Sequence, residues 1–128
     1  TGQLPAAPRP PRTGPVDRIA VVSGSVSQVT AAQIDWAEAN GFGLVAFDPA
    51  SVIDPERLGA EIGRATVSGI GVLNSGRSVL VHSARGPGDP RLPDYRAALD
   101  GAGLRADDGN RRIGEALGDV LSAILHQT

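Results

Sequence analysis

Three short apolar runs, separated by longer stretches with helical periodicity, dominate the hydrophobic pattern of this 128-residue chain. The runs IAVV, GLVAF and SVLVHS predict β-strands at residues 16–23, 43–47 and 78–83, because short apolar runs bounded by turn residues are typical of buried strands. Strands that alternate with helices favour a parallel sheet with right-handed crossovers. The sequence therefore predicts an α/β fold, a three-layer Rossmann-like domain with a mainly parallel sheet flanked by helices.

Capping residues predict where the first two helices begin and end. Thr30 and Gln33 have the spacing of a capping box, which predicts a helix that starts at Thr30 and ends at a left-handed cap on Gly41. Asp-Pro-Glu at residues 54–56 predicts the second helix, with Asp as N-cap and Pro in the first turn. We expect that helix to fade at residues 68–69, Ser-Gly.

The last third of the chain predicts a loop followed by two helices. Residues 85–93 are rich in Gly and Pro, and residues 95–99 fit a short helix. A strongly amphipathic helix follows residues 107–110. Its apolar stripe consists of Ile113, Leu117, Val120, Leu121, Ile124 and Leu125.

Composition separates the first 15 residues from the rest. Residues 1–15 are Pro-rich and hold little apolar surface, which predicts a linker, with the α/β domain at residues 16–128. Arg9 and Arg12 also fit a proline-rich recognition motif, although composition favours the plain linker.

Charge and composition restrict the function classes. The net charge of −2 gives no basis for binding nucleic acid or an anionic membrane, and no apolar run is long enough for a membrane span. The chain has no cysteine, which excludes disulfides and thiolate chemistry and fits a reducing compartment, so we expect a cytoplasmic protein.

The first candidate site follows the first predicted strand. Ligands of parallel sheets bind beyond the carboxyl ends of the strands. Here a Gly/Ser loop leads from a strand into a helix N-terminus, whose free N–H groups and dipole favour anions. The candidate residues for phosphate or nucleotide binding are Ser23, Gly24, Ser25, Ser27 and Thr30. Thr30 and Gln33 fit a purely structural cap equally well.

A second candidate site follows the third predicted strand and contains Ser83, Arg85 and Gly86. An arginine beside a glycine suits a phosphate, because the guanidinium forms paired hydrogen bonds with oxygens. The alternative is a surface arginine that is paired with Asp89 or Asp94.

Two further polar residues lie near strand ends. We interpret His82 as a packed, hydrogen-bonded side chain rather than a catalyst, because its neighbours are apolar. Asp48 could contact a ribose, but an aspartate before a proline more simply closes the loop.

The segment GVLNSGRS, residues 71–78, imitates a phosphate-binding P-loop. It has Arg77 where that motif needs lysine, and it precedes a strand instead of following one, so we interpret it as a turn. The sequence has no clustered metal-ligand pattern, so a magnesium ion would arrive with a bound nucleotide.

Three motifs resemble the nucleotide-binding C-terminal domain of the four-carbon acid sugar kinase family. They are SGSVSQVTAAQIDWA at residues 23–37, VLVHSARGPGDP at 79–90 and RRIGEALGDVL at 111–121. The resemblance covers most of the chain from about residue 16. The family also carries a GGDTSG-like loop after the last helix and a later glycine-rich loop, which this sequence lacks, so we expect an incomplete domain.

The resemblance implies the ATP-binding part of a kinase that phosphorylates threonate, erythronate or their keto forms. ATP with Mg²⁺ would be the cofactor, the sugar acid would bind to a separate substrate domain, and a homodimer is compatible with the resemblance. We expect no catalytic residue in this chain and no activity of the chain alone. The alternative is a stand-alone α/β binding or regulatory module without catalysis.

Overall fold

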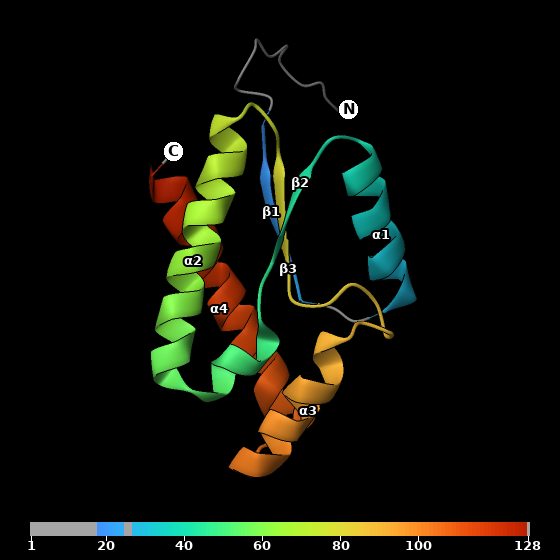
Figure 1. Ribbon diagram of the computed structural model, residues 1–128, viewed down its shortest axis with the longest axis vertical. Helices are drawn as coiled ribbons and strands as arrows, with labels where there is room; N and C mark the ends of the chain where they lie inside the picture. Colours follow the sequence, from blue (N-terminus) through green and yellow to red (C-terminus); the bar gives the residue numbers. More distant parts are fainter. Residues whose placement is uncertain (1–17, 25–26, 128) are drawn as a thin grey trace, which may run out of the picture.

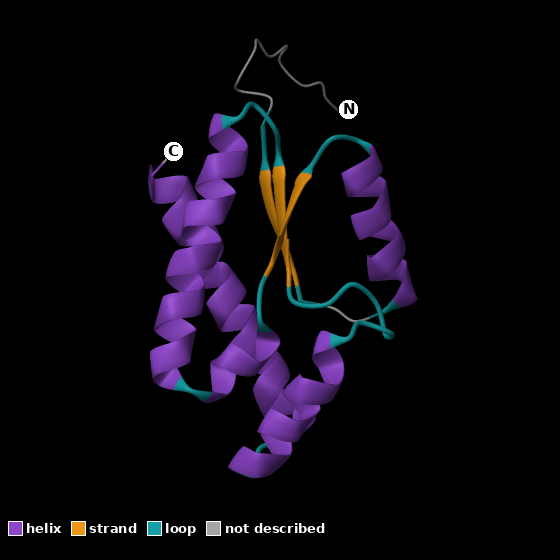
Figure 2. Ribbon diagram, viewed as in Figure 1, coloured by secondary structure: helices purple, strands orange, loops and turns teal. Residues whose placement is uncertain are grey.

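A three-stranded parallel sheet forms the centre of the computed structural model, which describes residues 18–24 and 27–127. The strands are β1 (Ala20–Ser23), β2 (Gly43–Ala46) and β3 (Val79–His82), in the order β1-β3-β2. Leu80 of β3 is in register with Val21 on one side and Leu44 on the other. The predicted α/β fold with a parallel sheet is confirmed, and Figure 2 shows the sheet between its layers of helices.

Helices cover both faces of this sheet (Figure 1). Helix α1 (Gln28–Ala39) lies on one face, and α2 (Pro55–Asn74) and α4 (Ala106–Gln127) lie together on the other. The short 3₁₀ helix η2 (Pro49–Ile53) and α3 (Arg91–Ala102) lie at the carboxyl ends of the strands. The sheet, α2 and α4 enclose the larger hydrophobic core, and a smaller one lies under α1.

The N-cap of the first helix lies three residues before the cap that Thr30 and Gln33 predicted. Ser27 is its N-cap, and the Ser27 Oγ accepts a hydrogen bond from the backbone N–H of Thr30 at 3.1 Å. The capping box at Thr30 is therefore wrong, because two potential caps lie one turn apart and the earlier one starts the helix. The predicted end is correct, since Gly41 has φ +90° and follows the C-cap.

The second helix runs past the serine and glycine where it was expected to fade. Asp54 caps it as predicted, with Oδ1 accepting from the N–H of Glu56 at 3.0 Å. It continues to Asn74. Gly69 lies where α2 meets α4, and a Cβ there would be 2.6 Å from Ile124 Cδ1, so this glycine serves the helix crossing and does not end the helix. Residues 71–74 of the P-loop-like segment are thus helical, and only its second half is the predicted turn before β3.

The last two helices also begin earlier than predicted. Helix α3 starts at Arg91, inside the expected loop, and α4 starts at Ala106. Most of the predicted stripe on α4 is buried, but Leu125 is 59% exposed and was wrongly assigned to the core. The predicted start of the first strand at residue 16 and the linker at residues 1–15 lie outside the described residues.

Candidate functional site

The carboxyl ends of β1 and β3 bring the two predicted loops together. The backbone N–H of Ser83 donates to the carbonyl of Ser23 at 3.1 Å. A Cβ on Gly24 would lie 3.9 Å from Ser83 Oγ, and a Cβ on Gly86 would lie 2.8 Å from the Cβ of Ala31 in α1. One end of the sheet therefore gathers both glycine-containing loops beside the first turn of α1.

The N-terminus of α1 supplies backbone donors to this end of the sheet. Ser27 occupies the N–H of Thr30, and the two hydroxyls are 3.0 Å apart. Among the described residues, nothing accepts from the N–H groups of Gln28 and Val29. Such first-turn N–H groups, with the positive end of the helix dipole, are suited to an anion. Thr30 is buried, and its hydroxyl accepts from the Ser27 hydroxyl, which makes it part of the helix cap.

Each of the two site glycines has a packing reason for being glycine. A Cβ on Gly24 would lie 3.3 Å from both Ile113 Cγ2 and Leu117 Cδ1 of α4. Gly86 has φ +92°, which strains any other residue, and has no room for a Cβ beside Ala31. Close approach of a ligand is therefore not needed to explain either glycine.

Arg85 reaches from the second loop to two acids on α1. Its Nη2 lies 2.8 Å from Asp35 Oδ1 and 2.5 Å from Glu38 Oε1. The hydrogen bonds that it donates, to Glu38 first and then to Asp35, raise the pKa of the guanidinium. The predicted alternative pairing with Asp89 or Asp94 is wrong, because the side chain turns toward α1. Arg85 therefore lies at the site as a guanidinium that is already ion-paired with Asp35 and Glu38.

A buried cluster of Asp89, Arg91 and His82 holds the second loop to the sheet. Asp89, with 4% of its side chain exposed, accepts from the backbone N–H of Arg85 at 2.6 Å and of Arg91 at 2.8 Å. The Arg91 guanidinium donates to the carbonyls of Phe47 and His82 and to Nδ1 of His82. One arginine therefore ties the ends of β2 and β3 to the start of α3.

The charges of this cluster fix the state of its members. Hydrogen bonds from Arg91 hold the pKa of Asp89 well below its ordinary value, so Asp89 is a carboxylate. Burial, and then the charges of Arg91 and Arg85, lower the pKa of His82 to about 4. His82 is therefore neutral near pH 7, and its Nδ1 accepts from Arg91 because a guanidinium can only donate.

Comparison with known proteins assigns this chain to a family. Residues 20–128 match the family described as "Nucleotide-binding C-terminal domain". The chain belongs to this family. It is also 43% identical over 124 residues to a 3-oxo-isoapionate kinase from Paraburkholderia graminis. That alignment covers 97% of this chain but 26% of the relative, so the chain spans about a quarter of that protein's length. No solved structure matched it.

Membership in the nucleotide-binding C-terminal domain family confirms the predicted resemblance. The structure places Ser23, Gly24, Ser27, Thr30, Ser83, Arg85 and Gly86 around one end of the sheet, whereas Ser25 lies outside the described residues. Whether these residues bind a nucleotide stays a prediction.

Two polar residues of this nucleotide-binding domain have the structural roles that were predicted. His82 is buried and hydrogen-bonded to Arg91. Asp48 closes its loop, since Oδ1 accepts from the N–H of Ala50 at 3.0 Å and Oδ2 pairs with Arg57 at 2.8 Å.

Sequence reasoning named Asp89 only as a possible partner of Arg85 and missed its pairing with Arg91, although a signal was present. Three Asp-Pro pairs, beginning at residues 48, 54 and 89, each start a helix with the aspartate Oδ1 bonded to the N–H two residues later. Only the second pair was recognised as a helix start, because glycines and prolines around Asp89 suggested an irregular loop.

The described part of the domain has no group of three or more His, Cys, Asp or Glu side chains that could hold a metal ion. Among its helices, none is both long enough and apolar enough to cross a bilayer.

Proposed function

We propose that this chain is the ATP-binding part of a kinase that phosphorylates four-carbon sugar acids such as threonate, erythronate or their keto forms. The observation that carries the proposal is the meeting of the Ser23 and Ser83 loops with the N-terminus of α1. A second support is the relative named as a kinase of 3-oxo-isoapionate.

In this proposal the triphosphate of ATP lies against the first turn of α1. The N–H groups of Gln28 and Val29 and the hydroxyl of Ser25 donate to its oxygens, and Mg²⁺ arrives with the nucleotide. The Ser27 hydroxyl joins them once it leaves Thr30. Ser83 is only 1% exposed and supports the site through its backbone bond to Ser23. Arg85 adds a cation once a phosphate competes with Asp35 and Glu38 for its guanidinium. The chain supplies position and charge, which dominate phosphoryl transfer.

The acceptor hydroxyl and its base belong to the sugar-binding domain in this proposal. The γ-phosphoryl group passes from ATP to the hydroxyl oxygen, ADP leaves, and the hydroxyl proton passes to that base. The chain alone therefore gives no turnover with threonate, erythronate or 3-oxo-isoapionate in a coupled ATP-consumption assay. Turnover of about 1 per second or more, a rate normal for kinases, would contradict the assignment of the acceptor site and its base to a separate domain.

An ATP titration followed by amide NMR tests the binding step itself. Chemical-shift changes should concentrate in residues 23–29 and 83–86, with a weak Kd of about 1 mM, equivalent to roughly −4 kcal/mol. Shifts confined to the turn at Asp48, or no shift up to 10 mM, would contradict the proposed site and favour a stand-alone module without nucleotide binding.

A further inference from the structure

Strand β1 has one edge, its free edge, to which no described residue hydrogen-bonds. Within the described residues it pairs with β3 alone, and the carbonyls of Ile19 and Ser23 accept from β3. Because the groups of a parallel strand alternate between its two sides, the N–H and C=O of Ala20 and Val22 point away from β3. No described group hydrogen-bonds to them on that side.

The opposite edge of the sheet is protected in a way that β1 is not. On β2, Arg64 donates to the carbonyl of Ala46, and Glu61 accepts from the N–H of Asp48 just beyond the strand. Natural proteins protect edge strands with charges, prolines or bulges. The β1 sequence AVVS has no charge and no proline. An edge of this kind is suited to pairing with another strand.

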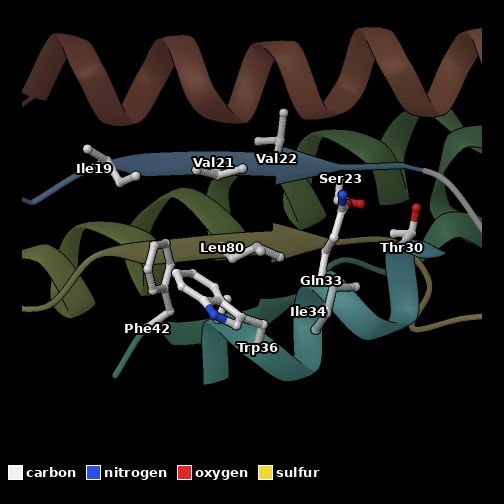
Figure 3. Close-up of a pocket in the computed structure, with 11 residues that line it drawn as sticks. Ile19, Val21, Val22, Ser23, Thr30, Gln33, Ile34, Trp36, Phe42 and Leu80 are labelled. Carbon is white, nitrogen blue, oxygen red and sulfur yellow. The ribbon is translucent and has the colours of Figure 1, made fainter. Parts of the chain in front are cut away.

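An apolar groove runs beside the free edge, on the face that α1 covers incompletely (Figure 3). Val21 and Leu80 lie at its base, and Ile34, Trp36 and Phe42 line it from α1 and the turn before β2. Trp36 is 61% exposed and Ile19 is 51% exposed, although both are large apolar side chains. The groove therefore places apolar side chains directly beside the outward backbone groups of β1.

The path of the chain indicates what covers this surface. Helix α2 connects β2 to β3 across one face, stepping along the sheet toward β1, and α4 lies on the same face and packs against β1. The C-terminal end of α4 lies at the amino ends of the strands (Figure 1). Right-handed crossovers require the next step on that face to continue in the same direction, so a strand that follows α4 falls outside β1.

We propose that the free edge of β1 and its groove bind an additional β-strand, parallel to β1, that is supplied by the polypeptide following α4 in a longer protein. The relative from Paraburkholderia graminis is about four times as long as its match to this chain, so a similar protein contains polypeptide beyond the matched part. An apolar residue of the added strand covers Val21, and its backbone pairs with Ala20 and Val22. Its carboxyl end then lies beside Ser23 and adds a loop to the candidate site.

Hydrogen exchange measured by mass spectrometry on the 128-residue chain and on the full product of its gene tests this proposal. The amides of Ala20 and Val22 should exchange at least about 100-fold faster in the shorter chain, because only the longer one pairs them. The outward amides of β2, Leu44 and Ala46, are the matched control and should change little. Three results would overturn the proposal: a reading frame that ends directly after α4, equal protection of β1 in both chains, or protection of the short chain that rises with its concentration and dimerisation.

A pair of proline variants separates edge pairing from general stability. Ala20→Pro removes an N–H that does not bond to β3, so the short chain should unfold at nearly unchanged urea concentration while the long chain loses the β1 protection. Val21→Pro removes an N–H that faces β3 and should destabilise both chains. Unchanged β1 protection in the long Ala20→Pro chain would show that no strand pairs with this edge.

Discussion

The guanidinium of Arg91 binds both carboxylate oxygens of Asp89, with Nε 2.9 Å from Oδ1 and Nη2 2.6 Å from Oδ2. The same guanidinium reaches the carbonyls that end β2 and β3. Two residues that are close in sequence thus fix the relative positions of strands that are far apart in sequence. The loop between them and β3 carries half of the candidate site.

Asp89→Asn should lower the free energy of unfolding by about 3 kcal/mol, since it leaves the partly buried Arg91 without its countercharge. Urea denaturation at pH 7.5 measures the change. Asp94→Asn, in the exposed first turn of α3, is the matched control and should change stability by less than about 0.5 kcal/mol. Equal effects of the two substitutions would contradict a structural role for the pair.

Stability should fall as the pH is lowered from 6.5 to about 4 because of His82. Its pKa is about 4 in the folded chain and 6.5 in the unfolded chain, so the unfolded state binds more protons across this range. The contribution is complete above pH 6.5 and amounts to about 3 kcal/mol when lost. Urea denaturation at a series of pH values measures it. His82→Asn keeps an acceptor for Arg91 and should flatten this part of the curve; an unchanged slope would assign the effect to other groups.

Two glycines of α4 should respond in opposite directions to alanine. A Cβ on Gly109 would lie 2.7 Å from Leu99 Cδ2 and 3.0 Å from Tyr95 Cζ, so Gly109→Ala should cost about 1–3 kcal/mol through overpacking. Gly114 has nothing within 4 Å of such an atom, and Gly114→Ala should stabilise the helix by up to about 1 kcal/mol. Thermal unfolding of the two variants checks both signs, and stabilisation by both would contradict the close contact between α3 and α4.

Gln28→Pro should weaken ATP binding about tenfold without loss of stability. Proline is well tolerated at the first position of a helix, and Ser27 before it has the extended backbone that a proline requires. The substitution removes one N–H that the proposed phosphate site uses, which is worth a hydrogen bond to a charged group. Isothermal calorimetry or the NMR titration compares it with Gln28→Ala, which keeps the N–H and should bind normally. Equal affinities would exclude the N-terminus of α1 from the site.

The strands and their parallel arrangement were predictable because each strand is a short apolar run with its own turn signals. The helix ends were less predictable. Ser27 and Thr30 are both good caps, and the continuation of α2 through Gly69 depends on Ile124, which is distant in sequence. The partners of Arg85 were beyond sequence reasoning for the same reason, since Asp35 and Glu38 become its neighbours only when α1 packs beside the second loop.

The central position of β3 has a consequence for how this chain folds during synthesis. Strands β1 and β2 do not pair with each other, and both pair with β3, which is made after them, with Val79 in register with both Ala20 and Gly43. Every backbone pairing of the sheet is therefore long-range, which slows folding relative to a hairpin of the same size. When only the first two strands have emerged from the ribosome, two apolar segments are exposed without a sheet. A chaperone that binds apolar segments could therefore bind this nascent chain before β3 emerges.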